Sequence, residues 1–279
     1  MVRVQIEQLA CCEPAGIGLQ LTHWSTRSLA EVARAGGVVP HIAHSTVSLI
    51  LRHATLQPHR CRYWKTPVLN TDFVRQASQI LWCYEQIEHL ARREEVVLCW
   101  DEKPNVQALE RHPTRPLAPG QIARQEFEYV RHGTVNFAVA MAVHDGSMRG
   151  WCLERNNSRH LCPVLAQLFG QWKSARKIHL IWDGGPSHGS GYTREFLRQY
   201  QGRVRVLFTP AHASWLNQGE LLLRAFAARY LHRGHWRSRQ QLIDHLIQAA
   251  REYDQAFAHP FTWSWTRGDL RRWVEKNGH

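Results

Sequence analysis

The sequence predicts an α/β protein in which helices flank a mixed five-stranded sheet, with a small helical domain in front. Apolar runs of strand length recur between residues 94 and 210, and the later ones alternate with helical patterns. The N-terminal part shows helical spacing only. With 279 residues, of which 44% are hydrophobic, the chain is long and apolar enough to bury a core.

The first helical pattern lies in residues 25–53. Ser25 or Thr26 can cap a helix that carries Leu29 and further apolar residues on one face, and Gly36-Gly37 end it. A second helix is expected from about His44. Two short helices around a glycine turn are typical of a helix-turn-helix, although ordinary helical hairpins share this pattern. The polar residues expected on the outer, DNA-reading face of the second helix are His44, Ser45, Ser48 and Arg52.

A basic, proline-bounded segment, LQPHRCRYWKTP, follows the predicted helix pair. Its cations Arg60, Arg62 and Lys65 are expected to contact a phosphate backbone. The whole chain carries a formal charge of +12, which favours a polyanionic partner. The expected organisation is a DNA-binding domain at 1–65, a linker and connecting helix at 66–93, and a catalytic domain at 94–279.

The catalytic part begins after a helix predicted at 71–91, capped by Thr71 or Asp72. Strands are expected at 94–102, 134–143, 149–156, 177–183 and 203–210. Helices are expected at 158–173, 192–200, 214–231 and about 238–258. Three strands in an antiparallel meander followed by alternating helix and strand are the element order of a ribonuclease-H-like domain.

Two aspartates stand where apolar strands are expected to end. Asp101 closes the first strand in CWDE, and Asp183 closes the fourth in IHLIWDGG. In open α/β sheets, ligands collect outside the carboxyl ends of strands. If the two strands are neighbours, the carboxylates face each other and need a cation between them, for which oxygen ligands favour Mg²⁺ or Mn²⁺.

A third carboxylate, Glu220, is expected on the helix at 214–231. Asn217 and Arg224 are expected on the same helical face as Glu220, with Trp215, Leu222 and other bulky residues buried. Taken singly, each carboxylate could be an ordinary turn, cap or surface residue.

Two neighbouring residues complete the candidate site. Glu102 is an alternative ligand to Asp101, although strand alternation points it to the opposite face. His188 reads as a capping or packing residue rather than a catalytic base. The 18 histidines and seven cysteines show no compact zinc-ligand spacing, and the cysteines read as reduced core thiols.

The motifs resemble a known family. The stretches THWSTRSLAEVA, VVLCWDEKPNVQALER, FEYVRHGTVNFAVA, IHLIWDGGPSHGS and TPAHASWLNQGELLLRAFAARYLHRGHWRS occur in the order found in bacterial insertion-sequence transposases of the mariner-like group, within the DDE superfamily. The chain departs from that pattern at Gly184, where the family usually has Asn. Relatives usually carry two helix-turn-helix units, and by this resemblance only the second of them is expected in residues 25–53.

The resemblance implies that Asp101, Asp183 and Glu220 form the catalytic and metal-binding triad. It implies a transposase that uses Mg²⁺ or Mn²⁺, with two ions expected, to cleave double-stranded DNA at terminal inverted repeats and to insert it at a TA-containing target. A homodimer is implied as well. The chain shows no signal peptide and no apolar run of membrane-spanning length, so a bacterial cytoplasmic, nucleoid-associated location is expected.

Two alternatives remain open at the level of sequence. One is a catalytically decayed or truncated DNA-binding relative that represses transposition, which the apparent lack of a first helix-turn-helix favours. The other is a general nuclease of RNA–DNA hybrids, which would share the metal chemistry without needing residues 25–53.

Overall fold

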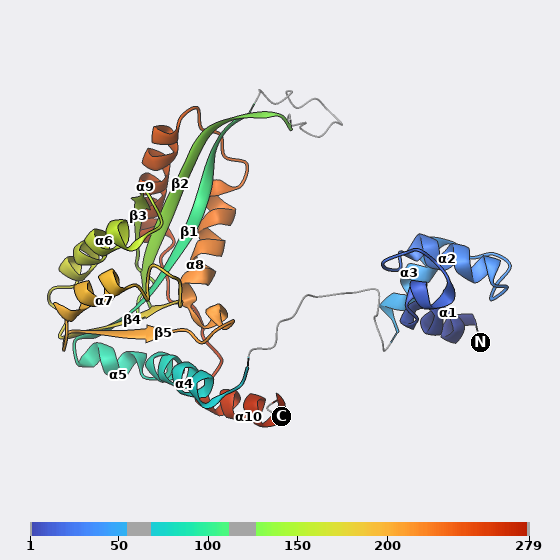
Figure 1. Ribbon diagram of the computed structural model, residues 1–279, viewed down its shortest axis with the longest axis horizontal. Helices are drawn as coiled ribbons and strands as arrows, with labels where there is room; N and C mark the ends of the chain where they lie inside the picture. The colour runs from blue at the N-terminus through green and yellow to red at the C-terminus, as the bar shows by residue number, and fades with distance from the viewer. Residues whose placement is uncertain (1, 55–67, 112–126, 278–279) are drawn as a thin grey trace. The chain divides into compact units, whose positions relative to one another are not determined.

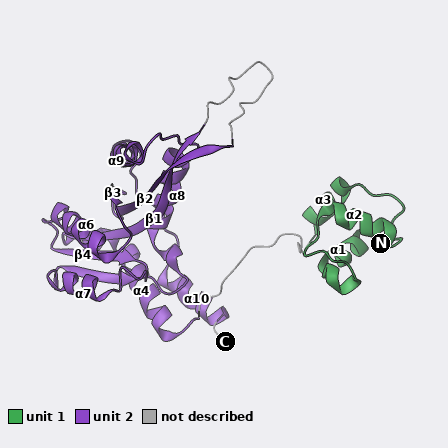
Figure 2. Ribbon diagram, turned by 45° about the horizontal axis from the view of Figure 1, so that its top comes forward, with its two compact units in different colours: residues 1–65 green, residues 66–279 purple. Residues whose placement is uncertain are grey.

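The computed structural model describes residues 2–54, 68–111 and 127–277. The chain divides into two compact units, Met1–Lys65 and Thr66–His279 (Figure 2). Each unit has its own hydrophobic core and is described by itself.

The first unit is a three-helix cluster formed by α1 (Val2–Cys11), α2 (Thr26–Ala35) and α3 (His44–Arg52). Its core is made of small and aliphatic side chains from all three helices, among them Ile6, Leu29, Ala33, Val47 and Leu51. The Ser25 hydroxyl caps α2 by accepting from the Ser28 amide at 3.0 Å. The sequence therefore predicted α2 and α3 closely but missed α1.

The turn between α2 and α3 needs its glycine, because Gly37 has φ +70°. On α3, His44, Ser45 and Arg52 are exposed as predicted, whereas Ser48 is half-buried. Ser48 lies one position after the buried Val47, which places it at the margin of the core rather than on the outer face. The predicted DNA contacts Arg60, Arg62 and Lys65 lie outside the described residues.

The second unit is built on a five-stranded sheet with strand order β3-β2-β1-β4-β5. The strands are β1 (Glu95–Arg111), β2 (Tyr129–Ala142), β3 (Met148–Leu153), β4 (Lys177–Trp182) and β5 (Val204–Phe208). β1, β2 and β3 pair antiparallel, and β4 and β5 continue the sheet in parallel with β1. This confirms the predicted mixed sheet and its element order.

The predicted end of β1 was wrong. β1 does not stop at residue 102 but continues to Arg111, paired with β2 in a long ribbon that extends past the other strands (Figure 1). Only the first part of β1, Glu95–Cys99, pairs with β4. Beyond that point β1 has no β4 neighbour. Pro104, which has no backbone N–H to donate to a neighbouring strand, is therefore tolerated there. Asp101 therefore lies inside β1, two residues past the last β4 pair.

Helices cover both faces of the sheet. One face packs against α6 (Ser158–Gln171) and α7 (Gly191–Arg198) through a core that includes Trp100 and Trp182. The other face packs against α4 (Thr71–Glu85), α5 (Ile87–Arg92), α8 (Gln218–Phe226) and α9 (Arg239–Ala256). The residue that follows each of those tryptophans, Asp101 or Asp183, therefore belongs to this second face or its margin.

The helix predicted at 71–91 is two helices, α4 and α5, and its cap is Asn70 rather than Thr71 or Asp72. The Asn70 side chain accepts from the Phe73 amide at 2.8 Å. Both helices belong to the core, because Phe73, Ile80 and Leu90 are buried with Val97 of β1.

The long helix predicted at 214–231 is also divided. A 3₁₀ turn (Ser214–Leu216) comes first, α8 begins after Asn217, and a π-helical turn (Ala227–Leu231) ends the segment. Asn217 is the N-cap of α8, so it does not share a helical face with Glu220 and Arg224 as predicted. Trp215 is 40% exposed rather than buried.

The remaining element is α10 (Arg267–Asn277), which the sequence analysis missed. Its Leu270 is buried in the same core as α4. Cys83, Cys99 and Cys162 are buried thiols as expected, but Cys11 and Cys12 are exposed. In the described ranges, no helix has the length and apolar character needed to cross a bilayer.

Candidate active site

The pairing of β1 with β4 brings Asp101 and Asp183 together. The last pair in this ladder is Cys99 with Ile181, and the next residues on the same face of the two strands are Asp101 and Asp183. Adjacent strands lie about 4.8 Å apart. The predicted meeting of the two carboxylates therefore follows from the register, even though β1 continues past its aspartate.

α8 approaches β1 closely enough to bring Glu220 to the same place. The side chain of Asn217 donates to the Trp100 carbonyl at 2.7 Å and accepts from the Gly219 amide at 3.0 Å, so it ties the start of α8 to β1. Gly219 makes this approach possible, because an added Cβ there would stand 2.8 Å from the Cβ of Asp101. Glu220 follows directly and is half-buried.

The charges that act on Asp101 are those of other carboxylates. Burial is the main cause that raises the pKa of Asp101 to about 7, and the negative charges of Glu102, Glu220 and Asp183 act in the same direction. The Glu102 amide, which donates to Asp101 Oδ1 at 2.9 Å, acts in the opposite direction. Glu220 and Asp183 therefore each lie within electrostatic range of Asp101.

Asp183 is held in a different way. Its Oδ1 oxygen lies 2.7 Å from His188 Nδ1 and accepts from the Gly185 amide at 2.9 Å. The hydrogen bond from His188 is the main cause that lowers the pKa of Asp183. Asp183 therefore stays ionised at neutral pH, whereas the pKa of Asp101 lies near 7.

His188 is neither a helix cap nor a simple packing residue. Its second nitrogen, Nε2, lies 2.9 Å from Glu102 Oε1, and its ring stacks on Trp182 with centroids 4.4 Å apart and planes 9° apart. Burial would lower the pKa of His188, but the hydrogen bonds and charges of Asp183 and Glu102 raise it to about 10. His188 is thus a buried cation between two carboxylates.

Glu102 lies on the opposite face of β1 from Asp101, as strand alternation predicts. Its side chain accepts from Trp100 Nε1 and is 7% exposed. Glu102 therefore belongs to the His188 contact and does not replace Asp101 in the carboxylate cluster. Arg224, near the end of α8, is exposed.

The residues that support this site were not predicted from the sequence. Trp100 and Trp182 each precede an aspartate, and Gly185 and Gly219 admit close contacts. The repeated Trp-Asp pair in CWDE and IWDGG was the available signal. Within residues 2–54, 68–111 and 127–277, no three His, Cys, Asp or Glu side chains are grouped so that they could hold a metal ion. Mutual repulsion of carboxylates opposes such a set in the absence of a cation.

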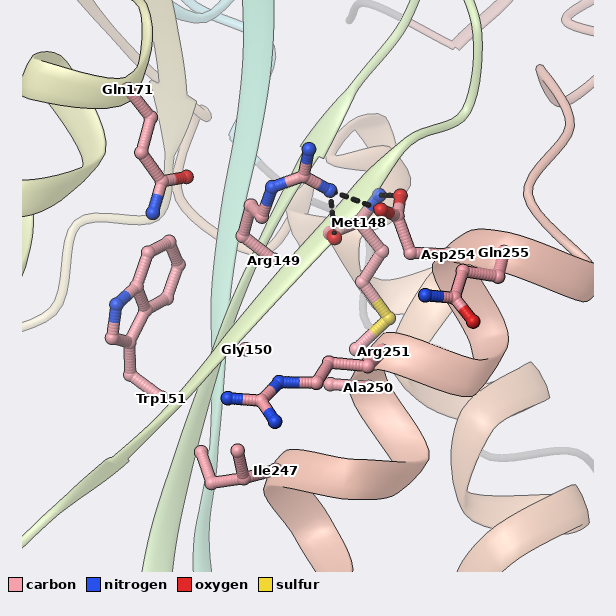
Figure 3. Close-up of a pocket in the computed structure, with 10 residues that line it drawn as sticks. All are labelled: Met148, Arg149, Gly150, Trp151, Gln171, Ile247, Ala250, Arg251, Asp254 and Gln255. Atoms are coloured by element: carbon pink, nitrogen blue, oxygen red, sulfur yellow. Dashed lines mark hydrogen bonds and ion pairs between the residues drawn. The ribbon is translucent and has the colours of Figure 1, made fainter.

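A pocket of about 450 Å³ lies away from these carboxylates, at the sheet edge formed by β3. Arg149 of β3 and Arg251 of α9 line it together with Trp151, and Figure 3 shows Arg149 directed at Asp254. Asp254 also accepts from the Met148 amide at 2.8 Å, so it joins α9 to the first residue of β3. None of the predicted site residues lines this pocket.

Comparison with known proteins gives a family match. A family model described as "DDE superfamily endonuclease" matches residues 96–243, which is more than half of the chain and includes Asp101, Asp183 and Glu220. A search of curated proteins found no match.

The solved structures that the chain matches include three of Mos1. The Mos1 mariner paired end complex with Mn has a TM-score of 0.49 and 15% identity, over 91% of this chain and 75% of that chain. The mariner Mos1 paired end complex with Mg has a TM-score of 0.49 and 16% identity, over 93% and 80%. The catalytic domain of Mos1 mariner transposase has a TM-score of 0.40 and 14% identity, over 71% and 100%.

Proposed function

Because this chain belongs to the DDE superfamily of endonucleases, we propose that it is a mariner-like transposase that cleaves DNA at the ends of a mobile element and joins them to target DNA. Asp101, Asp183 and Glu220 are its catalytic residues in this proposal. The observation that supports the assignment is that Asp101 and Asp183 follow the last pair of β1 with β4 on the same face, and that the charges of Glu220 and Asp183 both act on Asp101.

The donor chemistry of these residues fits divalent metal ions. Asp101 is a half-buried carboxylate whose neighbouring charges are negative, and such a group is stabilised in its ionised form when a cation binds. The donors are all carboxylate oxygens, which suit Mg²⁺ or Mn²⁺. We propose that Asp101, Asp183 and Glu220 hold two such ions. When bound, these ions supply Lewis-acid charge for the attacking and leaving oxygens of phosphoryl transfer.

The chain itself orients the reacting groups. Cleavage adds water to a phosphodiester and breaks the bond to the 3′ oxygen, and the released 3′-hydroxyl then displaces a 3′ oxygen from a target phosphodiester. No covalent enzyme intermediate is needed. Asn217 and Gly219 keep Glu220 against β1, and His188 keeps Asp183 in place. This positioning is the main contribution of a protein to phosphoryl transfer.

The first unit is proposed to recognise the element's terminal inverted repeats. Its exposed residues His44, Ser45 and Arg52 lie on α3, where they can reach base edges and phosphates of double-stranded DNA. Half-buried Ser48 and the basic residues Arg60, Arg62 and Lys65 are proposed as further contacts. We also propose a homodimer that holds two ends, a TA-containing target and a bacterial, nucleoid-associated location.

The test is a nicking assay on DNA that carries the element's inverted repeats, with Mg²⁺ or Mn²⁺. Asp183→Asn should abolish nicking and leave DNA affinity equal or slightly higher, since a charge that repels phosphate is removed. Asp244→Asn, which neutralises an exposed aspartate on α9, is the matched control and should nick like the wild type. Normal nicking by Asp183→Asn would exclude the proposed triad, and DNA binding without nicking by the wild type would favour the repressor alternative.

A further inference from the structure

The consecutive residues Asp101 and Glu102 serve opposite faces of the sheet. Asp101 lies against Gly219 at the start of α8, whereas Glu102 reaches His188 on the face covered by α6 and α7. His188 then crosses to Asp183 Oδ1, so that Glu102, His188 and Asp183 form one continuous chain of contacts. β1 therefore supplies Asp101 and, through Glu102 and His188, also contacts Asp183.

Each member of this chain is held by a further contact. The Trp100 indole donates to Glu102, the Trp182 ring stacks on His188, and the Gly185 amide donates to Asp183. The side chains of His188 and Glu102 are only 2% and 7% exposed, whereas that of Asp183 is 45% exposed. The chain therefore runs from the core outward and ends on an accessible carboxylate.

Two contacts reach the same oxygen of the Asp183 side chain, Oδ1: the Gly185 amide donates to it at 2.9 Å, and His188 Nδ1 pairs with it at 2.7 Å. His188 Nδ1 also lies 3.0 Å from the Asp183 backbone carbonyl oxygen. Among the described residues Oδ2 has no hydrogen-bond or ion-pair partner, so it is the oxygen available to a ligand, while Oδ1 is held by Gly185 and His188. Glycine at position 185 suits this arrangement, because an added Cβ would lie 3.0 Å from Asp183 Oδ1 and 3.3 Å from His188 Nδ1 and would require small shifts of both.

We propose that Glu102 and His188 are positioning residues that hold the Asp183 carboxylate ready for a divalent cation. This inference rests on the proposed function for the role of Asp183 itself. Partners of this kind orient a ligand without touching the ion, and their loss typically reduces metal affinity about 10- to 100-fold.

The experiment measures Mn²⁺ affinity of the metal-free, full-length protein without DNA, by electron paramagnetic resonance of free Mn²⁺. His188→Gln should weaken Mn²⁺ binding about 10- to 100-fold, because one amide cannot bridge both carboxylates. Glu102→Gln keeps an acceptor for His188 and Trp100, and should weaken binding less than His188→Gln but by more than twofold. The apparent Mg²⁺ requirement for nicking should rise in the same order.

His179→Gln is the matched control. His179 pairs with Glu95 at 2.8 Å with 2% and 6% side-chain exposure, which resembles the His188–Glu102 pair, but it lies earlier on β4, away from Asp183. It should lower the melting temperature and leave Mn²⁺ affinity unchanged. A merely structural role for His188 predicts the same result for His188→Gln.

The inference is overturned if folded His188→Gln binds Mn²⁺ within twofold of the wild type. If His188→Gln does not fold, Glu102→Gln decides by the same twofold limit, since it retains the imidazole. The proposed function fails separately, and before these variants are compared, if Asp183→Asn binds Mn²⁺ as tightly as the wild type does.

Discussion

Gly219→Ala is expected to disturb the site without removing any proposed catalytic group. The added methyl would stand 2.8 Å from the Asp101 Cβ and 3.1 Å from Asn217 Oδ1. Since carbon atoms pack best at about 3.5–4.0 Å, α8 would have to move away from β1 by about 1 Å. Overpacking of this kind costs about 1–3 kcal/mol of unfolding free energy, partly offset by about 0.8–1 kcal/mol from the better helix propensity of Ala.

A shift of that size should reduce nicking about 100-fold, because catalytic groups misplaced by about 1 Å lose rate on this scale. Glu220 would also move away from Asp101, so the pKa of Asp101 should fall below its present value of about 7. The measurements are the nicking rate and thermal unfolding, with Gly170→Ala on α6 as control, where nothing lies within 4 Å of the added carbon. Wild-type nicking and stability in Gly219→Ala would refute the close approach of α8.

Three further predictions concern other parts of the chain. The pKa of Asp101 lies near 7 instead of 3.8, so the folded protein retains a proton that the unfolded chain has released; metal-free stability should therefore fall between about pH 4 and pH 7. Asp101→Asn should flatten this decline in melting temperature, and an unchanged profile in EDTA would contradict the assigned pKa. Arg52→Ala should reduce the slope of log affinity against log salt by about 0.9, the value for one phosphate contact, and an unaltered slope would show that Arg52 makes no such contact. Gly146→Ala should destabilise the second unit by about 3 kcal/mol or more, because Gly146 has φ +75° and the added carbon would lie 2.0 Å from the His259 carbonyl oxygen; wild-type denaturant stability would count against that contact.

The sequence predicted the sheet because each buried strand is a short apolar run with clear ends. β4, for example, is bounded by Lys177 and Asp183, and the structure ends it at Trp182. β1 was predicted too short because its second part carries polar residues and Pro104, which read as a loop. Pairing with β2 alone keeps that part extended, and such long-range pairing leaves no local pattern in the sequence.

The start of α8 was predicted less well for a related reason. Residues 214–231 have continuous helical spacing, but the Asn217 side chain caps a new helix and bonds the Trp100 carbonyl. Trp215, assigned to the core from its size, instead lies exposed with its ring against Trp265 at 4.9 Å. Spacing alone cannot separate a long helix from a turn and a capped helix, because the deciding hydrogen bond comes from a distant strand.

In the site, strand alternation predicts the faces on which Asp101 and Glu102 lie, but it does not predict the contacts of His188. Alternation correctly sent Asp101 and Glu102 to opposite faces, and on that basis Glu102 reads as a poor metal ligand. It does not reveal that His188 stacks on Trp182 at the end of β4 and contacts both Glu102 and Asp183. In the proposed site, Asp101 is a direct ligand on one face of the sheet. Glu102, the next residue, acts on the other face, where it contacts Asp183 through the buried His188. In this proposal, the contacts of His188 with Asp183 and Trp182 offset part of the cost of burying Glu102 and His188.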